Sequence, residues 1–503
     1  MFRKVLIANR GEIAVRIIRA CRDLGIIPVA VYSEPDRASL HVRLADEAYF
    51  LGPAPSLESY LAIEKVIEAA KRSRADAIHP GYGFLSENPK FAYACAEAGI
   101  PMVGPSAESM QMMGSKTSAR SLLHKLGISL VPGTYAALTS VDDAIGEARA
   151  LGYPVMIKAS AGGGGKGMRF VASEPQMAED FVAAGSEALR AFGDSSLYLE
   201  KYIVDPRHVE VQILADRHGN VIHLGERECS IQRRHQKVLE ESPSPIMDEK
   251  LRRQMAETAI RIAQAARYEN AGTLEFLVDN DHNFYFLEMN TRLQVEHGVT
   301  EAVTGVDIVC EQFRIAAGEK LSLQQEQVEM RGWAMECRVC AEDPDHGMLP
   351  SAGVIDRLQE PQGPGVRLDS GVYQGWKVSI HYDPLLAKLI AYGADRAQTI
   401  ARMKRAIQEY RIAGIKTNLP FLLEILSDHE FAAGHTHIGF VDALQRRAAE
   451  VKEHAPSVFQ THALAAALAY AETSETASTQ QRPNPESPWK LSGRPGFSAL
   501  PGR

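Results

Sequence analysis

The chain has 503 residues, 45% of them hydrophobic and 23% charged, which is a globular composition with enough length for several domains. A formal net charge of −8 argues against nucleic acid as the main partner, because binding to phosphate backbones requires a basic field. The apolar run at the N-terminus is too short for a signal peptide and no run is long enough to span a bilayer, so we expect no membrane partner.

The first 50 residues follow the order strand, turn, helix, strand. Lys4 to Ala8 and Ile26 to Tyr32 are short apolar runs, and a helix with regularly spaced apolar residues begins at Gly11 between them. This order predicts a Rossmann-like layer, although no G-x-G-x-x-G motif supports a dinucleotide site. We expect a further helix from about Ser56 to Arg72 and a further strand from Ala75 to His79.

A glycine-rich loop, His79-Pro-Gly-Tyr-Gly-Phe-Leu-Ser-Glu-Asn88, follows that strand in a position that commonly lines a ligand site. Further along, Gly114-Ser-Lys-Thr117 resembles the end of a P-loop and precedes a predicted helix. The earlier glycine of that motif is missing, because position 109 is Ser and position 110 is Met, so Lys116 is a candidate phosphate contact outside any Walker site. Val131-Pro-Gly133 has the composition of a domain boundary.

Four consecutive glycines, Gly162 to Gly165, lie between two predicted strands. Such a loop offers bare amides that can wrap phosphate oxygens, and Lys158 on the entering strand can reach the same phosphates. This combination favours nucleotide binding over a mobile linker. Leu197 to Ile203 is the next apolar strand, and it contains the charged pair Glu200-Lys201.

Polar side chains then recur on one face of a predicted strand from His208 to Leu214, where His208, Glu210 and Gln212 alternate with apolar residues. Residues 225–244 form a dense basic cluster in an otherwise acidic protein. The cluster predicts a pocket for a small anion, with a solvated run of charges as the alternative.

Residues 273–290 predict a β-hairpin around a polar turn, with Asp279 opposite Phe284 and Glu275 opposite Glu288. The two glutamates then share one face and repel each other unless a cation lies between them. Asn290 adds a neutral oxygen on the same face. A set of ligands made only of oxygen suits Mg²⁺ or Mn²⁺ held together with a phosphate.

Arg292, Gln294 and Glu296 continue the two-residue spacing and place a cation, an amide and a carboxylate beside the predicted metal. A solvated hairpin edge with scattered charges is the alternative. The uninterrupted polar register from residue 288 to residue 296 favours a functional site.

The remaining predicted elements are a helix from about Asp307 to Ala317, a strand from Trp333 to Cys340 that carries Arg338, turn-rich strands over residues 350–392, and a helix from Thr399 to Tyr410. Residues 472–487 are polar and rich in Ser, Thr, Gln and Pro, which predicts a disordered linker.

The six cysteines are scattered along the chain, as expected for the reduced thiols of a cytoplasmic protein. Cys337 and Cys340 form a single C-x-x-C. A zinc site would need a second pair, so we interpret both as ordinary thiols on a strand.

Taken in order, Lys158, the four-glycine loop, His235-Gln-Lys237 and Glu288-Met-Asn-Thr-Arg-Leu-Gln-Val-Glu-His297 resemble the biotin carboxylase component of biotin-dependent carboxylases, which is an ATP-grasp enzyme. The resemblance covers about residues 1–446 and includes Ala8-Asn-Arg-Gly-Glu-Ile13 and Glu336-Cys-Arg338. It implies a fold that combines α/β and α+β parts. The implied domains are a Rossmann-like N-terminal domain at 1–115, an ATP-grasp lid at 116–205 that begins with a linker at 116–130, a C-terminal ATP-grasp/biotin carboxylase domain at 206–446, and a partly disordered tail at 447–503.

The resemblance also implies the reaction. ATP and bicarbonate give carboxyphosphate, whose CO₂ carboxylates biotin on a carrier, as the first half-reaction of an acetyl-, propionyl- or methylcrotonyl-CoA type carboxylase. Mg²⁺ or Mn²⁺, with two ions per site, is implied as cofactor. The implied partners are a biotin carboxyl carrier protein or domain, a carboxyltransferase subunit, and further copies of the chain in a homo-oligomer or larger complex.

Site residues carry over by their match to the family's motifs. The residues that match ATP contacts are Lys116, Lys158, Gly164, Gly165, His208 and His235, with Glu200, Lys201 and Ile203 on the adenine-binding strand. The metal ligands are matched by Glu275, Glu288 and Asn290. The bicarbonate contacts are matched by Lys237, Arg292, Gln294 and Val295, the general base by Glu296, and the group beside biotin by Arg338.

Some residues depart from the family pattern. Gly298 replaces the usual Pro next to the base, which predicts looser positioning of Glu296, and Cys340 replaces Asn of stand-alone bacterial members. The segment from Tyr382 to Ile390 resembles acyl-CoA carboxylase α chains more closely. Because no Ala/Val-Met-Lys-Met motif occurs, the chain holds no biotinylation lysine, and the carrier is either separate or part of a longer chain. Two other functions remain as alternatives: a different ATP-grasp ligase, and a non-catalytic ATP-binding scaffold subunit.

Overall fold

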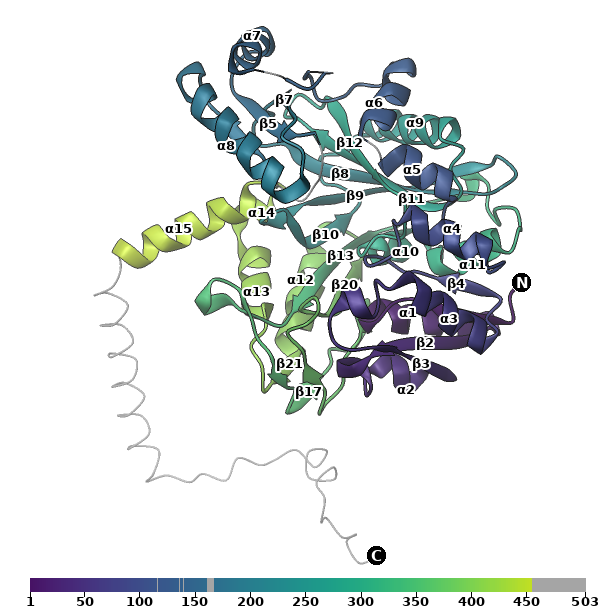
Figure 1. Ribbon diagram of the computed structural model, residues 1–503. Coiled ribbons are helices and arrows are strands. Elements are labelled where there is room, and N and C mark those ends of the chain that lie inside the picture. Colours follow the sequence, from purple (N-terminus) through teal and green to yellow (C-terminus); the bar gives the residue numbers. More distant parts are fainter. Residues whose placement is uncertain (115, 135, 139, 161–166, 455–503) are drawn as a thin grey trace, which may run out of the picture. The chain divides into compact units, whose positions relative to one another are not determined.

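Figure 1 shows a computed structural model that describes residues 1–114, 116–134, 136–138, 140–160 and 167–454. The chain divides into two compact units, Met1–Val441 and Asp442–Arg503. In the second unit, the described residues 442–454 belong to helix α15 (Phe440–His454). The linker predicted over residues 472–487 lies outside the described residues.

A parallel sheet with strand order β3-β2-β1-β4 begins the first unit and confirms the predicted Rossmann-like layer. Its strands are short and apolar because a parallel sheet is covered on both faces. The helix predicted from Ser56 begins only at Ile63. The chain turns between them because Tyr60 is buried in the core and its hydroxyl donates to Asp36 Oδ2 over 2.6 Å.

The elements of this part are β1 (Lys4–Ile7), α1 (Gly11–Asp23), β2 (Ile27–Ser33), η1 (Glu34–Asp36), α2 (Leu40–Leu44), β3 (Glu47–Gly52), η2 (Ser56–Glu58), α3 (Ile63–Ser73), β4 (Ala77–His79), α4 (Pro89–Glu97), α5 (Ala107–Gly114) and α6 (Lys116–Lys125). The segment Gly114 to Thr117, predicted to precede a helix, is already helical on either side of residue 115: Gly114 ends α5 and Lys116 begins α6. Met110, Met113 and Leu123 are buried at helical spacing, which explains the difference.

A small antiparallel sheet with strand order β6-β5-β7 follows, packed with two helices. It contains α7 (Val141–Leu151), β5 (Val155–Ala159), β6 (Arg169–Val171), α8 (Glu174–Phe192) and β7 (Leu197–Lys201). The strands predicted on both sides of the glycine run are confirmed as β5 and β6. Gly133 of the predicted boundary segment forms a bridge to Glu200 on β7.

A large antiparallel sheet with strand order β12-β11-β8-β9-β10-β13-β20-β18 dominates the rest of the described chain. Helix α9 covers one face through Leu251, Met255 and Ile262. The strand predicted from Trp333 to Cys340 is confirmed at both ends as β13. Among the helices that the structure describes, none has the length and apolar character that a membrane crossing requires.

The helices and strands of this region are β8 (Arg207–Ala215), β9 (Val221–Arg233), β10 (Gln236–Ser242), α9 (Glu249–Ala265), β11 (Asn270–Val278), β12 (Phe284–Asn290), α10 (His297–Thr304), α11 (Ile308–Ala316), η3 (Gln325–Gln327), β13 (Trp333–Cys340), β14 (Glu342–Asp343), η4 (Pro344–His346), β15 (Leu349–Pro350), β16 (Gly353–Val354), β17 (Arg357–Gln359), β18 (Val366–Ser370), β19 (Lys377–Val378), β20 (Leu385–Gly393), α12 (Arg396–Glu409), β21 (Arg411–Ala413), α13 (Leu419–Ser427) and α14 (His429–Ala432).

Candidate active site

Three carboxylates lie in register across neighbouring strands of the large sheet. Glu275 on β11 pairs with Glu288 on β12, as predicted, and on its other side Glu275 pairs with Glu210 on β8, a pairing that was not predicted. We call these three residues the carboxylate row. Adjacent like charges destabilise a sheet, so a row of this kind indicates that cations bind there.

The predicted turn register of the hairpin is wrong by one residue. Phe284 lies opposite Val278 rather than Asp279. A β-bulge at Leu287, which has no partner between the pairs Phe276–Phe286 and Glu275–Glu288, absorbs the extra residue. The glutamate pair is therefore kept while the turn shifts, because a bulge places two residues of one strand against one of the other.

Lys237 on β10 supplies the central cation. Its Nζ donates to Glu210 Oε2 at 2.6 Å, to Glu275 Oε1 at 2.8 Å and to Glu296 Oε1 at 2.7 Å. Burial lowers the pKa of Lys237, but the three carboxylates raise it to a net value well above the usual range. The amine is therefore charged at neutral pH and offsets much of the repulsion in the row.

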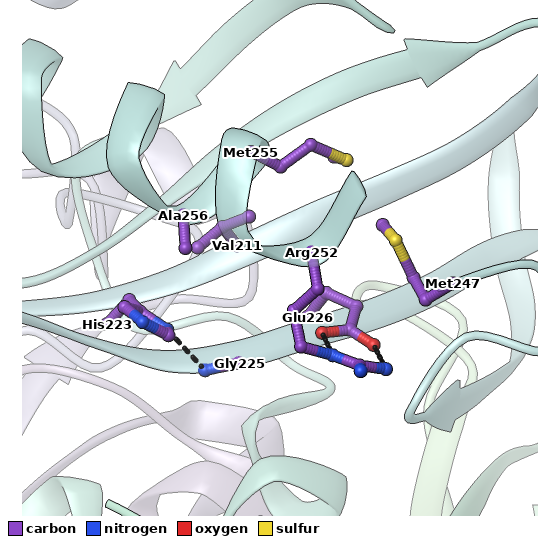
Figure 2. Close-up of a pocket in the computed structure, with 8 residues that line it drawn as sticks. All are labelled: Val211, His223, Gly225, Glu226, Met247, Arg252, Met255 and Ala256. Atoms are coloured by element: carbon purple, nitrogen blue, oxygen red, sulfur yellow. Dashed lines mark hydrogen bonds and ion pairs between the residues drawn. The ribbon is translucent and has the colours of Figure 1, made fainter. Parts of the chain in front are cut away.

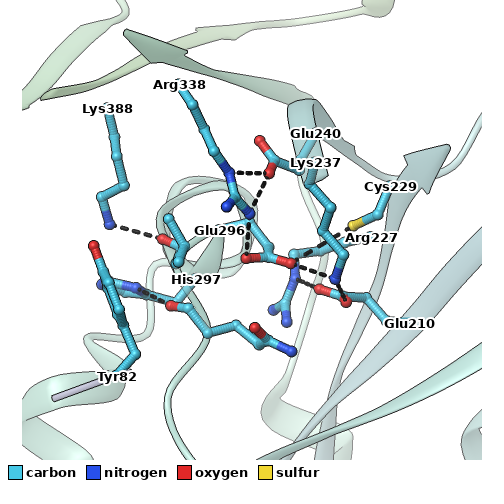
Figure 3. Close-up of polar contacts among 12 residues, drawn as sticks. Tyr82, Glu210, Arg227, Cys229, Lys237, Glu240, Glu296, His297, Arg338 and Lys388 are labelled. Atoms are coloured by element: carbon cyan, nitrogen blue, oxygen red, sulfur yellow. Dashed lines mark hydrogen bonds and ion pairs between the residues drawn. The ribbon is translucent and has the colours of Figure 1, made fainter. Parts of the chain in front are cut away.

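Glu296 lies between two cations in a fully buried position (Figure 3). Besides Lys237, it accepts from Arg338 Nη2 at 3.0 Å, and Arg338 Nε donates to Glu240 at 2.6 Å. Burial raises the pKa of Glu296, but Lys237 and Arg338 lower it to a net value well below normal. Burial also raises the pKa of Glu240 to about 7, although Arg338 opposes the rise.

Residues 291–296, which we call the base loop, leave the sheet where β12 ends at Asn290. The predicted two-residue spacing therefore does not come from a continuing strand. The loop nevertheless brings the predicted residues together around Glu275 Oε1, which accepts from Asn290 Nδ2 at 2.9 Å and from Gln294 Nε2 at 3.1 Å. Arg292 donates to Asn290 Oδ1 and Gln294 Oε1 and pairs with Glu87 at 2.8 Å.

The predicted metal ligands fit a divalent ion on the chemistry of their donors. Desolvation and the negative charge of Glu275 raise the pKa of Glu288, and the opposing effects of His208 and Lys237 do not offset them. Glu275 also contacts His208 Nε2 through Oε2 at 2.9 Å. A hard cation between Glu275 and Glu288, with the Asn290 amide beside them, would relieve the repulsion.

The predicted ATP contacts are spread over the small sheet and the strands that follow it. Lys158 on β5 forms an ion pair with Glu200 on β7, and Lys201 Nζ donates to Gly152 O at 2.6 Å. Ile203 follows β7, and His235 lies exposed in the β9–β10 turn with φ 62°. Lys116 begins α6, but its side chain lies outside the described residues, as do Gly164 and Gly165.

The prediction that the basic cluster as a whole forms an anion pocket needs correction. Arg227 is a structural residue inside the sheet, Arg233 pairs with Glu342 at 3.0 Å, and Arg234 lies in the exposed turn. From this segment, Lys237 reaches the buried cluster. The roles of Glu240 and Glu87 were missed, since lone glutamates in a polar segment carry no signal of a cross-strand partner.

Arg227 provides a stability test of the carboxylate row. It is fully buried and donates to Glu210 at 2.5 Å, to Gln212 at 2.8 Å and to Thr300 at 2.9 Å. Arg227→Met should cost about 3–5 kcal/mol, because it leaves a buried charge and buried polar groups without their partner. Calorimetry at one scan rate should show a clear fall in Tm.

The control for that change is Arg149→Met, which breaks an exposed pair with Glu174. We expect no measurable shift in Tm from this variant, because exposed ion pairs are screened by solvent. Equal Tm values for the Arg227 and Arg149 variants would contradict the structural role of Arg227.

A pocket elsewhere in the sheet lacks this chemistry. It lies between β8, β9 and α9 and has an empty volume of about 180 Å³. Arg252 forms a double ion pair with Glu226 (Figure 2), and both contacts are 2.9 Å long. Its other lining residues are Val211, His223, Gly225, Met247, Met255 and Ala256. The pair satisfies both charges, so nothing in the pocket is poised for catalysis.

Gly298 lies in α10, next to the base loop, without a left-handed backbone angle. A Cβ there would lie 2.4 Å from Ile390 Cδ1 and 3.0 Å from Glu336 Oε2. The structure therefore leaves no room for a side chain at Gly298, and the looser positioning of Glu296 stays a prediction. All six cysteines are free, as predicted, and Cys337 and Cys340 both lie on β13.

Three family models match most of the chain. Their descriptions are biotin carboxylase N-terminal domain over residues 1–110, carbamoyl-phosphate synthase L chain ATP-binding domain over residues 115–324, and biotin carboxylase C-terminal domain over residues 336–443. Together, the three models cover the part of the chain that holds the buried cluster around Lys237, and two of them describe biotin carboxylase domains.

Individual relatives agree with this arrangement. Biotin carboxylase 1 of Bacillus subtilis is 52% identical over 443 residues, which are 88% of this chain and 98% of the relative. The mitochondrial methylcrotonoyl-CoA carboxylase subunit alpha of Rattus norvegicus is 50% identical over 440 residues, 87% of this chain and 61% of that longer protein. The biotin carboxylase domain dimer of Hydrogenobacter thermophilus 2-oxoglutarate carboxylase, solved with MgADP, ADP and bicarbonate, is 44% identical with a TM-score of 0.83. The match covers 91% of this chain and 99% of that one.

Proposed function

The chain belongs to the biotin carboxylase family of ATP-grasp ligases, and we propose that the cluster around Lys237 carries its ATP- and bicarbonate-dependent carboxylation of biotin. The observation that carries this assignment is a buried carboxylate, Glu296, held between Lys237 and Arg338 beside the carboxylate row. Such a group can take a proton from an anion that the neighbouring cations hold.

Glu296 is the base in this proposal. Its lowered pKa keeps it ionised at neutral pH, so it is ready to accept the proton of bicarbonate. Lys237, Arg292, Gln294 and Val295 bind the bicarbonate anion. As Lys237 turns from Glu296 toward bicarbonate, Glu296 becomes more basic, which drives the proton transfer.

Phosphoryl transfer from ATP to a bicarbonate oxygen gives carboxyphosphate. Lys116, Lys158, Gly164, Gly165, His208 and His235 contact the nucleotide, with Glu200, Lys201 and Ile203 beside the adenine. Mg²⁺ or Mn²⁺, two ions per site, held by Glu275, Glu288 and Asn290 would neutralise the charge that develops on the phosphates. The MgADP and bicarbonate bound in the Hydrogenobacter thermophilus domain support the choice of ATP and Mg²⁺.

Arg338 acts on biotin. Its guanidinium cannot serve as a base, because its pKa is raised still further by its buried carboxylate partners, although burial opposes this. It can stabilise the negative charge that develops on the ureido oxygen of biotin when the nitrogen attacks CO₂.

The partners follow from the relatives. Relatives named as subunits of larger carboxylases support a biotin carboxyl carrier protein or domain and a carboxyltransferase subunit as partners, with further copies of the chain in an oligomer. The free thiols of the described chain favour the cytoplasmic location that the sequence predicts.

Glu288→Gln tests the metal ligands. The change keeps size but removes one negative charge, so the Mg²⁺ concentration needed for half-maximal ATP cleavage should rise at least about tenfold, as one charged ligand is lost. A Mg²⁺ titration of ADP release at saturating bicarbonate measures this. Glu249→Gln, on the exposed start of α9, is the control, and an unchanged Mg²⁺ requirement in Glu288→Gln would remove this residue from the metal site.

The function itself is tested by ADP release at saturating bicarbonate with and without free biotin. Stimulation by biotin is expected, because the ureido nitrogen consumes the CO₂ that carboxyphosphate supplies. Turnover with a purine-type amine in place of biotin would favour another ATP-grasp ligase. Tight nucleotide binding without turnover would favour a scaffold subunit, a reading that the presence of both Glu296 and Arg338 argues against.

A further inference from the structure

A buried lysine supports the base loop from the side opposite Lys237. Lys388 on β20 lies directly across from Arg338 on β13 and has no exposed surface. Its Nζ donates to the carbonyl oxygen of Val295 at 2.7 Å, one residue before the base (Figure 3). The contact joins residues 93 positions apart in the chain. The base loop is thus held at one end by Asn290, the last residue of β12, and at the other by the hydrogen bond from Lys388 to Val295.

Acidic residues from two other elements surround that ammonium. Glu12 of α1 lies 3.6 Å from Nζ and Asp369 of β18 lies 4.0 Å away, while the ring of Tyr82 lies 5.9 Å away. Tyr82 belongs to the glycine-rich loop after β4, and its hydroxyl donates to Glu12. Burial lowers the pKa of Lys388, yet its acidic neighbours raise it overall, so the group is a cation.

A role in packing alone does not explain this arrangement. Burying an ammonium costs free energy that an apolar side chain of similar length would not, even with carboxylates nearby. An apolar residue, however, could not donate to Val295 O and hold that peptide in one orientation. Displacing a catalytic group by about 1 Å can cost on the order of 100-fold in rate, so fixing the peptide before Glu296 has a large catalytic effect.

We propose that Lys388 is a positioning residue that holds the Val295–Glu296 peptide, so that the Glu296 carboxylate and the bicarbonate contacts of the base loop meet the substrate in one geometry. The inference rests on the proposed function of this site. It also gives roles to Glu12 and Tyr82: they keep Lys388 charged and in place from the N-terminal layer.

The test compares Lys388→Met with Arg396→Met in bicarbonate-dependent ADP release. Arg396 is a matched control because it is a largely buried cation of α12 that pairs with Glu241 at 2.8 Å and, within the described part of the chain, forms no hydrogen bond or ion pair with the base loop. Both variants lose a buried charge. Active sites are counted by titration with an ATP analogue, so that misfolded protein does not enter kcat.

We expect Lys388→Met to raise the KM for bicarbonate roughly tenfold and to lower kcat by about 10- to 100-fold, with the KM for ATP changed less than about twofold. Arg396→Met should leave both KM values unchanged. Lys388→Arg, which keeps a cation and a donor, should recover part of kcat. Should Lys388→Met fail to fold, the double variant Lys388→Met/Glu12→Gln, which balances the charge, takes its place with the same expected kinetics.

An unchanged KM for bicarbonate in an active, folded Lys388→Met protein, or in the double variant, would overturn the positioning role of Lys388 and leave the proposed function standing. A wild-type protein without bicarbonate-dependent ADP release would instead overturn the proposed function, and this inference with it.

Discussion

Replacing Glu296 with Gln is expected to lower both bicarbonate-dependent ATP cleavage and biotin carboxylation by at least about 100-fold, the lower end of what general-base catalysis supplies. The amide keeps the shape of the side chain but cannot accept the proton of bicarbonate. Lys237 retains Glu210 and Glu275 as partners, and Arg338 retains Glu240, so the fold should persist. Steady-state ADP release and fixation of labelled bicarbonate into biotin measure the two activities.

Glu241→Gln is the matched control for this variant. Glu241 is also a buried carboxylate with cationic and Trp partners, Arg396 and Trp333, but it lies outside the cluster around Lys237. Both activities should remain near wild type. ATP cleavage that persists in Glu296→Gln while biotin carboxylation is lost would remove Glu296 as the base for bicarbonate.

Arg338→Ala is expected to separate the two activities. Biotin carboxylation should fall by about 100-fold or more, as for loss of one oxyanion donor, while bicarbonate-dependent ATP cleavage falls less than about tenfold. The difference arises because Arg338 stabilises the ureido oxygen in the second step, whereas in the first step Lys237 still holds Glu296 when Arg338 is lost. Without Arg338, burial should raise the pKa of Glu240 above its present value of about 7 and leave its carboxyl group neutral. The variant then has no unpaired charge at Glu240, so the fold should tolerate the change.

The control is Arg233→Ala, which removes an arginine at the end of β9 that pairs with Glu342 instead. Its two activities should stay in the wild-type ratio. If Arg338→Ala lowered both activities equally, Arg338 would act on bicarbonate or on Glu296 rather than on biotin.

The sequence predicted the local elements of the site well, because alternation and turn residues are local signals. The opposition of Glu275 and Glu288, the strand from Trp333 to Cys340 and the strands around the glycine run are all confirmed. The bulge at Leu287 escaped prediction, since an apolar residue in an apolar strand does not reveal that it is unpaired.

Long-range partners could not be predicted by alternation. Arg227 and Lys237 look alike in a basic segment, yet one is a structural residue inside the sheet and the other meets three carboxylates. The difference depends on which strands become neighbours. The hydrogen bond from Lys388 to Val295 likewise depends on which strands become neighbours, here β13 and β20. The sequence around Lys388 gave no sign of a link to the base Glu296.

Labelling bicarbonate with ¹⁸O tests the central claim most directly, that the cluster transfers the phosphoryl group of ATP to an oxygen of bicarbonate. That oxygen bridges carbon and phosphorus in carboxyphosphate and stays with phosphorus when CO₂ leaves. The inorganic phosphate released should therefore carry one ¹⁸O per turnover, detected by mass spectrometry. Phosphate that takes its new oxygen from water, with none from bicarbonate, would contradict the assignment.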